Sequence, residues 1–302
     1  MSWLVITISA YFILAGAFLV DKYLLTSLIP NPKIYAFYVG LLGVASLLLV
    51  PVFGLYIPEP FQLISALLAG AVFIYALSWF YKTLKIFEAS RAVPAVGGLT
   101  PIFTLLLIYV ASFGKETFSL SELMAFVLLI LGSVFINLRK DRLITIESFK
   151  YSILSAFLFS LAFVLTKYAY LGQPFWNGFI WRALGGFIAA ILFYLVFPEV
   201  RKDAFKGEKT MSRKTKIIFF LNQAGGTGAS ILQNWAIFLA PLASVPLIQA
   251  LNGTQYVFIL LFAVILSLKF PQFLKEEISG GILAQKIIAM ILIAGGLAIL
   301  AL

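Results

Sequence analysis

The sequence contains no cysteine and no histidine, and only 11% of its 302 residues are charged. The missing cysteines exclude disulfide bonds and thiolate metal sites, and the missing histidines exclude imidazole ligands and histidine acid–base catalysis. Apolar residues dominate instead, at 62% of the chain and a mean hydropathy of +1.05. Soluble domains are nearer half apolar and a quarter charged. The composition therefore predicts an integral membrane protein.

Ten apolar runs are long enough to cross a bilayer core, which needs about 20 residues per helix. They span residues 3–21, 34–54, 61–82, 90–112, 119–138, 148–170, 175–197, 216–239, 242–267 and 281–302. The first run lacks a preceding basic region and a small-residue cleavage site, so we expect a retained helix and not a signal peptide. The pattern predicts an all-α protein with ten transmembrane helices.

The positive charges indicate an orientation. Nineteen of the 22 Lys and Arg residues fall in the connections after odd-numbered runs, including the basic loop 198–215. Because short loops rich in Lys and Arg stay in the cytoplasm, we expect both termini outside in a multi-pass plasma (cell inner) membrane protein. The same distribution explains the net charge of +10 without a nucleic-acid partner.

The two halves of the chain are similar to each other. Residues 17–23 (AFLVDKY) match residues 162–168 (AFVLTKY). In the last apolar run of each half, Ala125 and Gly132 match Ala289 and Gly296. Each half holds five runs, an odd number, so the halves must enter the membrane in opposite senses. This predicts two inverted five-helix repeats, residues 1–142 and 143–302, an architecture on which alternating access is commonly built.

Two apolar segments, residues 88–107 and 240–259, carry helix-breaking residues at corresponding positions. A bilayer tolerates such residues where neighbouring groups or a lined cavity satisfy the freed carbonyls. Paired interrupted segments in two halves point to a transporter's binding site. We therefore expect broken helices acting as hinges at Pro94, Gly97, Gly98, Pro101, Pro246 and Gly253.

Three stretches carry a resemblance to known proteins. The first is residues 81–104, with Tyr81-Lys82-Thr83-Leu84 and Thr100-Pro101-Ile102-Phe103-Thr104; the second is the copy of this stretch at residues 234–258; the third is Trp181-Arg182. These stretches resemble the EamA-type members of the drug/metabolite transporter superfamily, and the resemblance spans the whole chain. It implies a secondary transporter whose cavity is formed by the first, third and fourth helices of each repeat. One departure is Phe37-Tyr38-Val39-Gly40, where the family often carries an arginine.

Arg182 is the one charge well inside an apolar run, on the order of 10 Å deep at 1.5 Å per residue. An intramembrane charge costs at least ~2.5 kcal/mol, so it is expected to face the bundle interior, where it could hold a carboxylate or phosphate. The alternative is that it snorkels or binds helix carbonyls. Lys167 is expected to be a snorkelling anchor, and Asp21 a helix-end residue beside Lys22.

Uncharged polar residues cluster in the second half. Gln249, Asn252 and Tyr256 are spaced i, i+3, i+7 and share one helical face. Such amides could bind a neutral or zwitterionic solute, or could hold helices together. Tyr75 and Trp79 offer an aromatic face in the third run. The predicted substrate-binding residues are Tyr75, Trp79, Arg182, Gln233, Gln249, Asn252 and Tyr256.

Enzyme signals are missing from the sequence: there is no phosphate-binding loop with its lysine, and no carboxylate pair at membrane depth. We expect no enzyme, cofactor or metal, but a secondary transporter, in particular an exporter, of small metabolites such as amino acids or organic anions. A proton is a candidate coupling ion, and the protein is expected to be a monomer or homodimer. Two alternatives stay open: a multidrug or lipophilic-compound exporter, and a non-transporting interaction or lipid-handling protein.

Overall fold

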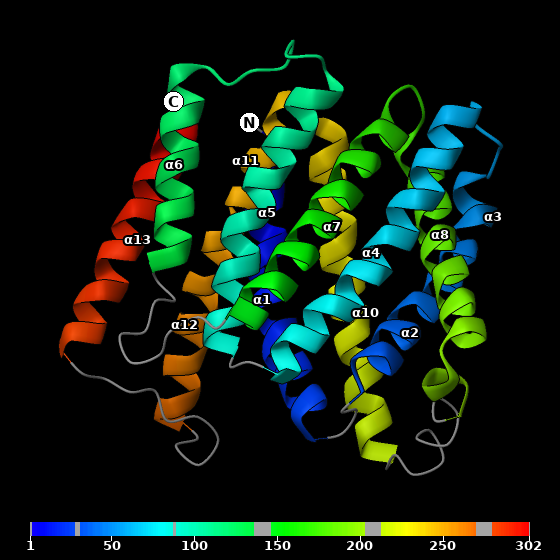
Figure 1. Cartoon of the computed structure of the whole chain (residues 1–302), viewed down its shortest axis with the longest axis horizontal. Coiled ribbons are helices and arrows are strands. Elements are labelled where there is room, and N and C mark those ends of the chain that lie inside the picture. Colours follow the sequence, from blue (N-terminus) through cyan, green and yellow to red (C-terminus); the bar gives the residue numbers. More distant parts are fainter. Residues whose placement is uncertain are drawn as a thin grey trace.

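The computed structural model describes residues 2–27, 31–86, 89–135, 146–202, 213–269 and 280–301. Within these ranges the chain is helical and contains no strand. Figure 1 shows the long helices side by side in one bundle, with the start of α1 and the end of α13 at the same, upper end. The all-helical fold class is confirmed.

Every predicted apolar run coincides with a helix or a succession of helices. The first half contains α1 (Ser2–Ser27), α2 (Pro32–Leu41), the 3-10 helix η1 (Leu42–Leu49), α3 (Val50–Phe53), α4 (Pro60–Ile86), α5 (Ala89–Ala111) and α6 (Leu120–Phe135). The second half contains α7 (Ile146–Tyr170), α8 (Phe175–Val196), α10 (Arg213–Leu239), the 3-10 helix η2 (Leu242–Ser244), α11 (Val245–Ala250), α12 (Asn252–Lys269) and α13 (Gly280–Ala301).

Six stretches of the described chain are long and apolar enough to cross a membrane: Ser2–Asp21, Pro32–Phe53, Pro60–Thr83, Lys150–Tyr170, Phe175–Val196 and Ala284–Ala301. Their outward faces, and those of neighbouring helices, carry large apolar side chains such as Leu48, Val110 and Ile291, which are mostly exposed. A lipid environment is the one in which such surfaces are stable. The protein is therefore embedded in a membrane.

The expectation of two broken helices is wrong for the first segment. α5 continues from Ala89 to Ala111 through both prolines and both glycines. Hydroxyl groups add hydrogen bonds to other carbonyls of this stretch: Thr100 Oγ1 donates to the Val96 carbonyl (2.7 Å), and Ser160 Oγ of α7 donates to the Thr100 carbonyl (2.7 Å). Proline removes one helical hydrogen bond, but a membrane helix packed among neighbours can continue through it.

The second segment does break. α11 ends at Ala250, and α12 begins at Asn252. Pro246 lies in the first turn of α11, where its missing N–H has no intrahelical partner to lose. The break therefore comes after the proline, at Leu251.

Close helix contacts position the functional side chains. α4 packs along α7 and α8, α1 along α10, α5 along α7, and α6 along α13. α4 and α8 approach backbone to backbone: a Cβ on Gly70 would collide with the Arg182 carbonyl, and one on Gly185 with the Leu67 carbonyl. This contact fixes the part of α8 that carries Arg182.

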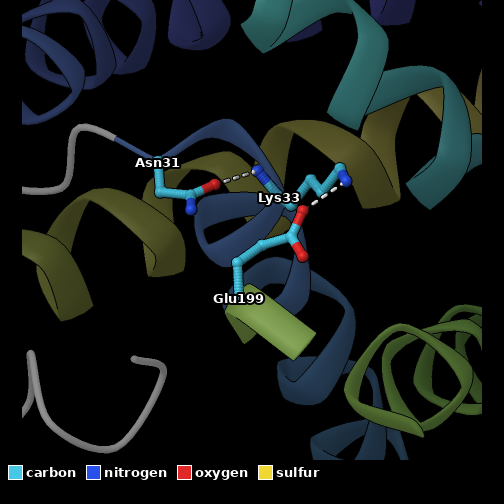
Figure 2. A network of polar contacts seen from close by, with 3 residues as sticks. All are labelled: Asn31, Lys33 and Glu199. Carbon is cyan, nitrogen blue, oxygen red and sulfur yellow. Dashed lines mark hydrogen bonds and ion pairs between the residues drawn. The ribbon is translucent and has the colours of Figure 1, made fainter. Parts of the chain in front are cut away.

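A small polar network lies at the start of α2, as Figure 2 shows. The Asn31 side chain accepts a hydrogen bond from the Lys33 backbone N–H (3.0 Å) and so caps α2. Lys33 Nζ lies 2.5 Å from Glu199 Oε1 and 3.9 Å from the centre of the Phe197 ring. The hydrogen bond from Lys33 lowers the pKa of the Glu199 carboxyl. Of the predicted basic loop 198–215, residues 203–212 lie outside the described residues.

Candidate functional site

A cavity of about 710 Å³ lies inside the bundle. That volume is typical of a site for a small organic molecule. Its walls come from α1, α2, η1, α4, α5, α7, α8, α10, α11 and α12, and most of its lining is apolar. The aromatic part of the lining includes Phe18, Phe73, Phe80, Phe159, Phe163, Phe179 and Phe220.

Arg182 lines this cavity and is only 7% exposed. Its Nε donates to the Thr166 hydroxyl (3.0 Å), which in turn donates to the Ala162 carbonyl (2.7 Å). The guanidinium carbon lies 4.9 Å from the centre of the Phe73 ring. No carboxylate of the described residues forms an ion pair with it. The site therefore contains an oriented positive charge that an anionic group could neutralise.

The four predicted polar residues of α10, α11 and α12 also line the cavity: Gln233, Gln249, Asn252 and Tyr256. Gln249 Nε2 and Asn252 Oδ1 are buried and have no hydrogen-bond partner among the residues that the structure describes. Asn252 Nδ2 lies 3.4 Å from the Tyr256 hydroxyl. Gln233 Nε2 donates to the Tyr11 hydroxyl (3.3 Å). Tyr11 also lines the cavity and was not predicted from the sequence. Tyr11 is hard to find from sequence because it is one of many aromatic residues in apolar runs.

Gly97 of α5 faces two side chains of α12. A Cβ at Gly97 would collide with the Tyr256 hydroxyl and would lie 3.2 Å from Asn252 Nδ2. Glycine at this position leaves room for the side chains of Tyr256 and Asn252 against α5. Among the predicted hinge residues, Gly97 is the one that lines the cavity.

The other predicted hinge residues lie elsewhere. Gly98 faces Val134 of α6, and a Cβ on Gly253 would collide with the Ser133 hydroxyl. Pro101 and Pro246 are buried in their helices without lining the cavity, and the Pro94 side chain lies outside the described residues. Gly98 and Gly253 therefore serve helix packing against α6.

Asp21 differs from its expected place at a helix end. α1 continues to Ser27, so Asp21 lies inside the helix and lines the cavity. Its carboxylate accepts hydrogen bonds from the Tyr35 hydroxyl and from Asn222 Nδ2 (2.7 Å for the latter). Gln223 Nε2 donates to the same Tyr35 hydroxyl (3.2 Å). The sequence pattern ended the run at Asp21 because charges follow there, but an α-helix can extend beyond the apolar core.

Lys167 is not the snorkelling anchor that the sequence suggested. It is 5% exposed, and its Nζ donates to the carbonyls of Ile237 (3.1 Å), Phe238 (3.2 Å) and Ala240 (2.5 Å). The last carbonyls of a helix lack partners and carry partial negative charge. Lys167 therefore caps the C-terminus of α10 and lies outside the cavity lining.

Tyr75 and Trp79 do not line the cavity. Tyr75 is 40% exposed and packs edge-on against Phe193 of α8. Trp79 stacks on Tyr151 of α7 at 5.6 Å, with Lys82 Nζ 4.9 Å from its ring centre. Their i, i+4 spacing reflects contacts between helices, and the structure does not bring them to the other predicted binding residues.

Comparison with known proteins supports the fold alone. No protein-family model matches the sequence, and no curated protein matches it. A solved crystal structure of a protein superposes on this chain with a TM-score of 0.70 and 17% sequence identity, covering 100% of this chain and 99% of the other. The whole helical arrangement therefore occurs in an experimental structure.

Proposed function

We propose that this protein is a secondary transporter that carries small organic anions or zwitterions, such as amino acids, by alternating access. The observation that carries the proposal is the buried guanidinium of Arg182, which meets a cavity of about 710 Å³ without a carboxylate partner among the described residues. Burying a positive charge inside a membrane protein costs free energy, and such charges are usually paired with a partner or bind a ligand. As part of this proposal, we assign the protein to the EamA type of the drug/metabolite transporter superfamily.

Reciprocal helix contacts support the proposed inverted repeat of ten membrane-crossing helices. A Cβ on Gly132 of α6 would lie 3.0 Å from the Ala289 carbonyl of α13, and one on Gly296 of α13 would lie 3.1 Å from the Ala125 carbonyl of α6. These are the residues that match between the two halves. Exchanging the halves exchanges the two contacts, as a pseudo-two-fold axis requires.

Two further features support the same arrangement. The contact of α4 with α7 has its counterpart in that of α10 with α1, and the contact of α5 with α7 in that of α12 with α1. The helix ends at both termini lie at the same end of the bundle, which fits an even number of crossings (Figure 1). We place the termini outside and the basic connections in the cytoplasm of a plasma membrane protein.

The same packing bears on the oligomeric state. Gly132 and Gly296 face each other's helices within one chain, so these glycines are not available to a second copy. The cavity is complete within one chain, and a monomer or a homodimer joined elsewhere could transport. A membrane gradient would supply the energy, with export as the proposed direction and a proton as a candidate coupling ion.

A second candidate function is export of lipophilic cations. One observation favours it: the Asp21 carboxylate lines the same aromatic-walled cavity as Arg182. A cation over aromatic faces and beside a carboxylate would be stabilised there. The two candidates predict ligands of opposite charge.

The test is ligand-induced thermal stabilisation of the detergent-solubilised protein against amino acids, organic anions, sugar phosphates and lipophilic cations. A ligand that binds only the native state stabilises it by roughly 2.7 kcal/mol at a hundredfold excess over its Kd. We expect carboxylate- or phosphate-bearing ligands to stabilise the wild type, Arg182→Lys to weaken the effect, and Arg182→Ala to abolish it. Arg201→Ala, at an exposed position, is the matched control.

The outcomes separate the candidates. Stabilisation by anions that survives in Arg182→Ala would remove Arg182 from the site. Stabilisation by lipophilic cations alone would favour the second candidate. For any ligand found, uptake into proteoliposomes under an imposed gradient then tests transport itself, and binding without transport would contradict the proposed function.

A further inference from the structure

We infer that Gln249 and Asn252 form a second recognition point in the cavity, which binds an uncharged group able both to accept and to donate a hydrogen bond, such as a hydroxyl or a carboxamide. The inference rests on the proposed function, because it concerns the same cavity and the same solute. It narrows the substrate to organic anions or zwitterions that carry such a group in addition to the one bound by Arg182.

The two residues stand on either side of the break between α11 and α12. Both line the cavity, yet Gln249 Nε2 and Asn252 Oδ1 are buried and find no hydrogen-bond partner within the described part of the chain. Buried polar atoms in folded proteins are nearly always paired. An amide nitrogen needs an acceptor and an amide oxygen needs a donor, so a hydroxyl or carboxamide complements the pair.

Two neighbouring polar groups, those of Tyr11 and Gln233, already form hydrogen bonds. The Tyr11 hydroxyl donates to the Ile248 carbonyl (3.0 Å) and accepts from Gln233 Nε2 (3.3 Å). This carbonyl lies at the break, where Tyr11 of α1 supplies its partner. These bonds fix the wall on which the two amides stand, but they leave one atom of each amide unpaired.

A purely structural role fits these two amides poorly. Amides that hold membrane helices together do so by hydrogen-bonding across the helix interface. Asn234 is such a case: its Oδ1 accepts from the Tyr170 hydroxyl of α7 (3.0 Å), and its Nδ2 donates to the Ser230 carbonyl (2.7 Å). Gln249 Nε2 and Asn252 Oδ1 make no such bond, although both residues line a cavity between helices.

The experiment uses matched probes that differ only in the uncharged group. Straight-chain alkanoates of increasing length are compared with their ω-hydroxy and ω-carboxamide derivatives, with Kd measured by titration of the full-length protein in detergent. The variants are Gln249→Leu and Asn252→Leu. The matched control is Gln62→Leu, because Gln62 also has an unpartnered atom, Oε1, but does not line the cavity.

We expect one chain length at which the ω-hydroxy or ω-carboxamide probe binds the wild type about three- to tenfold more tightly than the plain alkanoate. Both leucine variants should lose that preference, and their thermal unfolding without ligand shows whether they are folded. Gln62→Leu should keep the preference.

Two results would overturn the inference. Equal binding of plain and substituted probes by the wild type at every length is one, and a preference that survives in both leucine variants is the other. In both cases alkanoate binding that depends on Arg182 would leave the proposed function standing. If no anionic probe binds the wild type, the proposed function fails and this inference fails with it.

Discussion

At the scale of single residues, three charged side chains of the described residues lie inside the bundle, and each has a different kind of partner. Arg182 is oriented by Thr166 and meets the cavity, Asp21 accepts hydrogen bonds from Tyr35 and Asn222, and Lys167 caps a helix end. Thr166 matches Asp21 in the aligned halves. In the proposed repeat, a carboxylate in the first half thus corresponds to a hydroxyl in the second half, and that hydroxyl accepts a hydrogen bond from Arg182.

Lys167 gives the first prediction at this scale. Replacing it with methionine should leave three carbonyls near the end of α10 without their donor, while conserving much of the side-chain volume. We expect Lys167→Met to cost about 1–3 kcal/mol of stability, because buried groups are left unpaired. Lys150→Met, at the exposed start of α7, is the matched control.

Thermal unfolding in detergent measures both variants. A fall in the apparent melting temperature for Lys167→Met, with little change for Lys150→Met, supports the capping role. Equal shifts for the two variants would mean that Lys167 is an ordinary membrane anchor after all. Ligand binding should be retained by folded Lys167→Met, because this side chain does not line the cavity.

Five of the seven binding residues predicted from sequence line the cavity, namely Arg182, Gln233, Gln249, Asn252 and Tyr256. They were predictable because a polar side chain in an apolar run is costly and must have a reason. Tyr75 and Trp79 were not, because an aromatic pair at helical spacing serves helix packing equally well. The sequence did not predict the contributions of Tyr11, Tyr35 and Phe73. Their positions in the site depend on the rotation of each helix and on its neighbours, which cannot be inferred from one sequence.

At the scale of helices, the apolar runs predicted where each helix lies, since length and hydropathy are local properties. The fate of the interrupted segments was not local. α5 stays continuous through Pro94 and Pro101, whereas the helix is interrupted at Leu251, where there is no proline. The positions of the prolines alone therefore do not predict where a membrane helix is interrupted.

The packing of α6 on α13 gives a prediction from two adjacent glycines. A Cβ at Gly296 would lie 2.8 Å from Leu129 Cγ and 3.1 Å from the Ala125 carbonyl, whereas at Gly295 the nearest atom is Leu128 Cδ1 at 3.8 Å. Alanine in place of glycine favours a helix by about 1 kcal/mol at either position. We expect Gly295→Ala to be neutral or stabilising, and Gly296→Ala to be destabilising by about 1–3 kcal/mol because of overpacking.

The two variants control for each other, because they share helix, neighbourhood and composition. Chemical or thermal unfolding in the same detergent gives the comparison. If Gly296→Ala is as stable as Gly295→Ala, the close approach of α6 and α13 is not present in solution, and the reciprocal contact no longer supports the inverted repeat.

At the scale of the whole molecule, the helices that correspond in the proposed inverted repeat make different contacts. α4, the third helix of the first half, packs through Gly70 against the backbone of α8. Its counterpart α10 meets α2 through aromatic side chains such as Tyr35 and Phe219, 5.8 Å apart. A Cβ added at any of the three α10 glycines, Gly225, Gly226 and Gly228, would meet no atom within 4 Å. An inverted-repeat transporter changes state when the halves exchange such arrangements.

This asymmetry predicts a variant that binds ligand normally but transports it more slowly. Gly226 lines the cavity and has free space in this state, so Gly226→Val should fold and should still be stabilised by ligand. In the exchanged state α10 would pack closely, and the added side chain would cost about 1.4 kcal/mol or more, which slows transport about tenfold.

Gly228→Val is the matched control, since it also has free space but does not line the cavity. Proteoliposome flux and ligand stabilisation, measured on both variants, separate the two steps. Normal flux through Gly226→Val would show that α10 stays apart from its neighbours throughout the cycle, and exchange of the two arrangements could not then be the transport step.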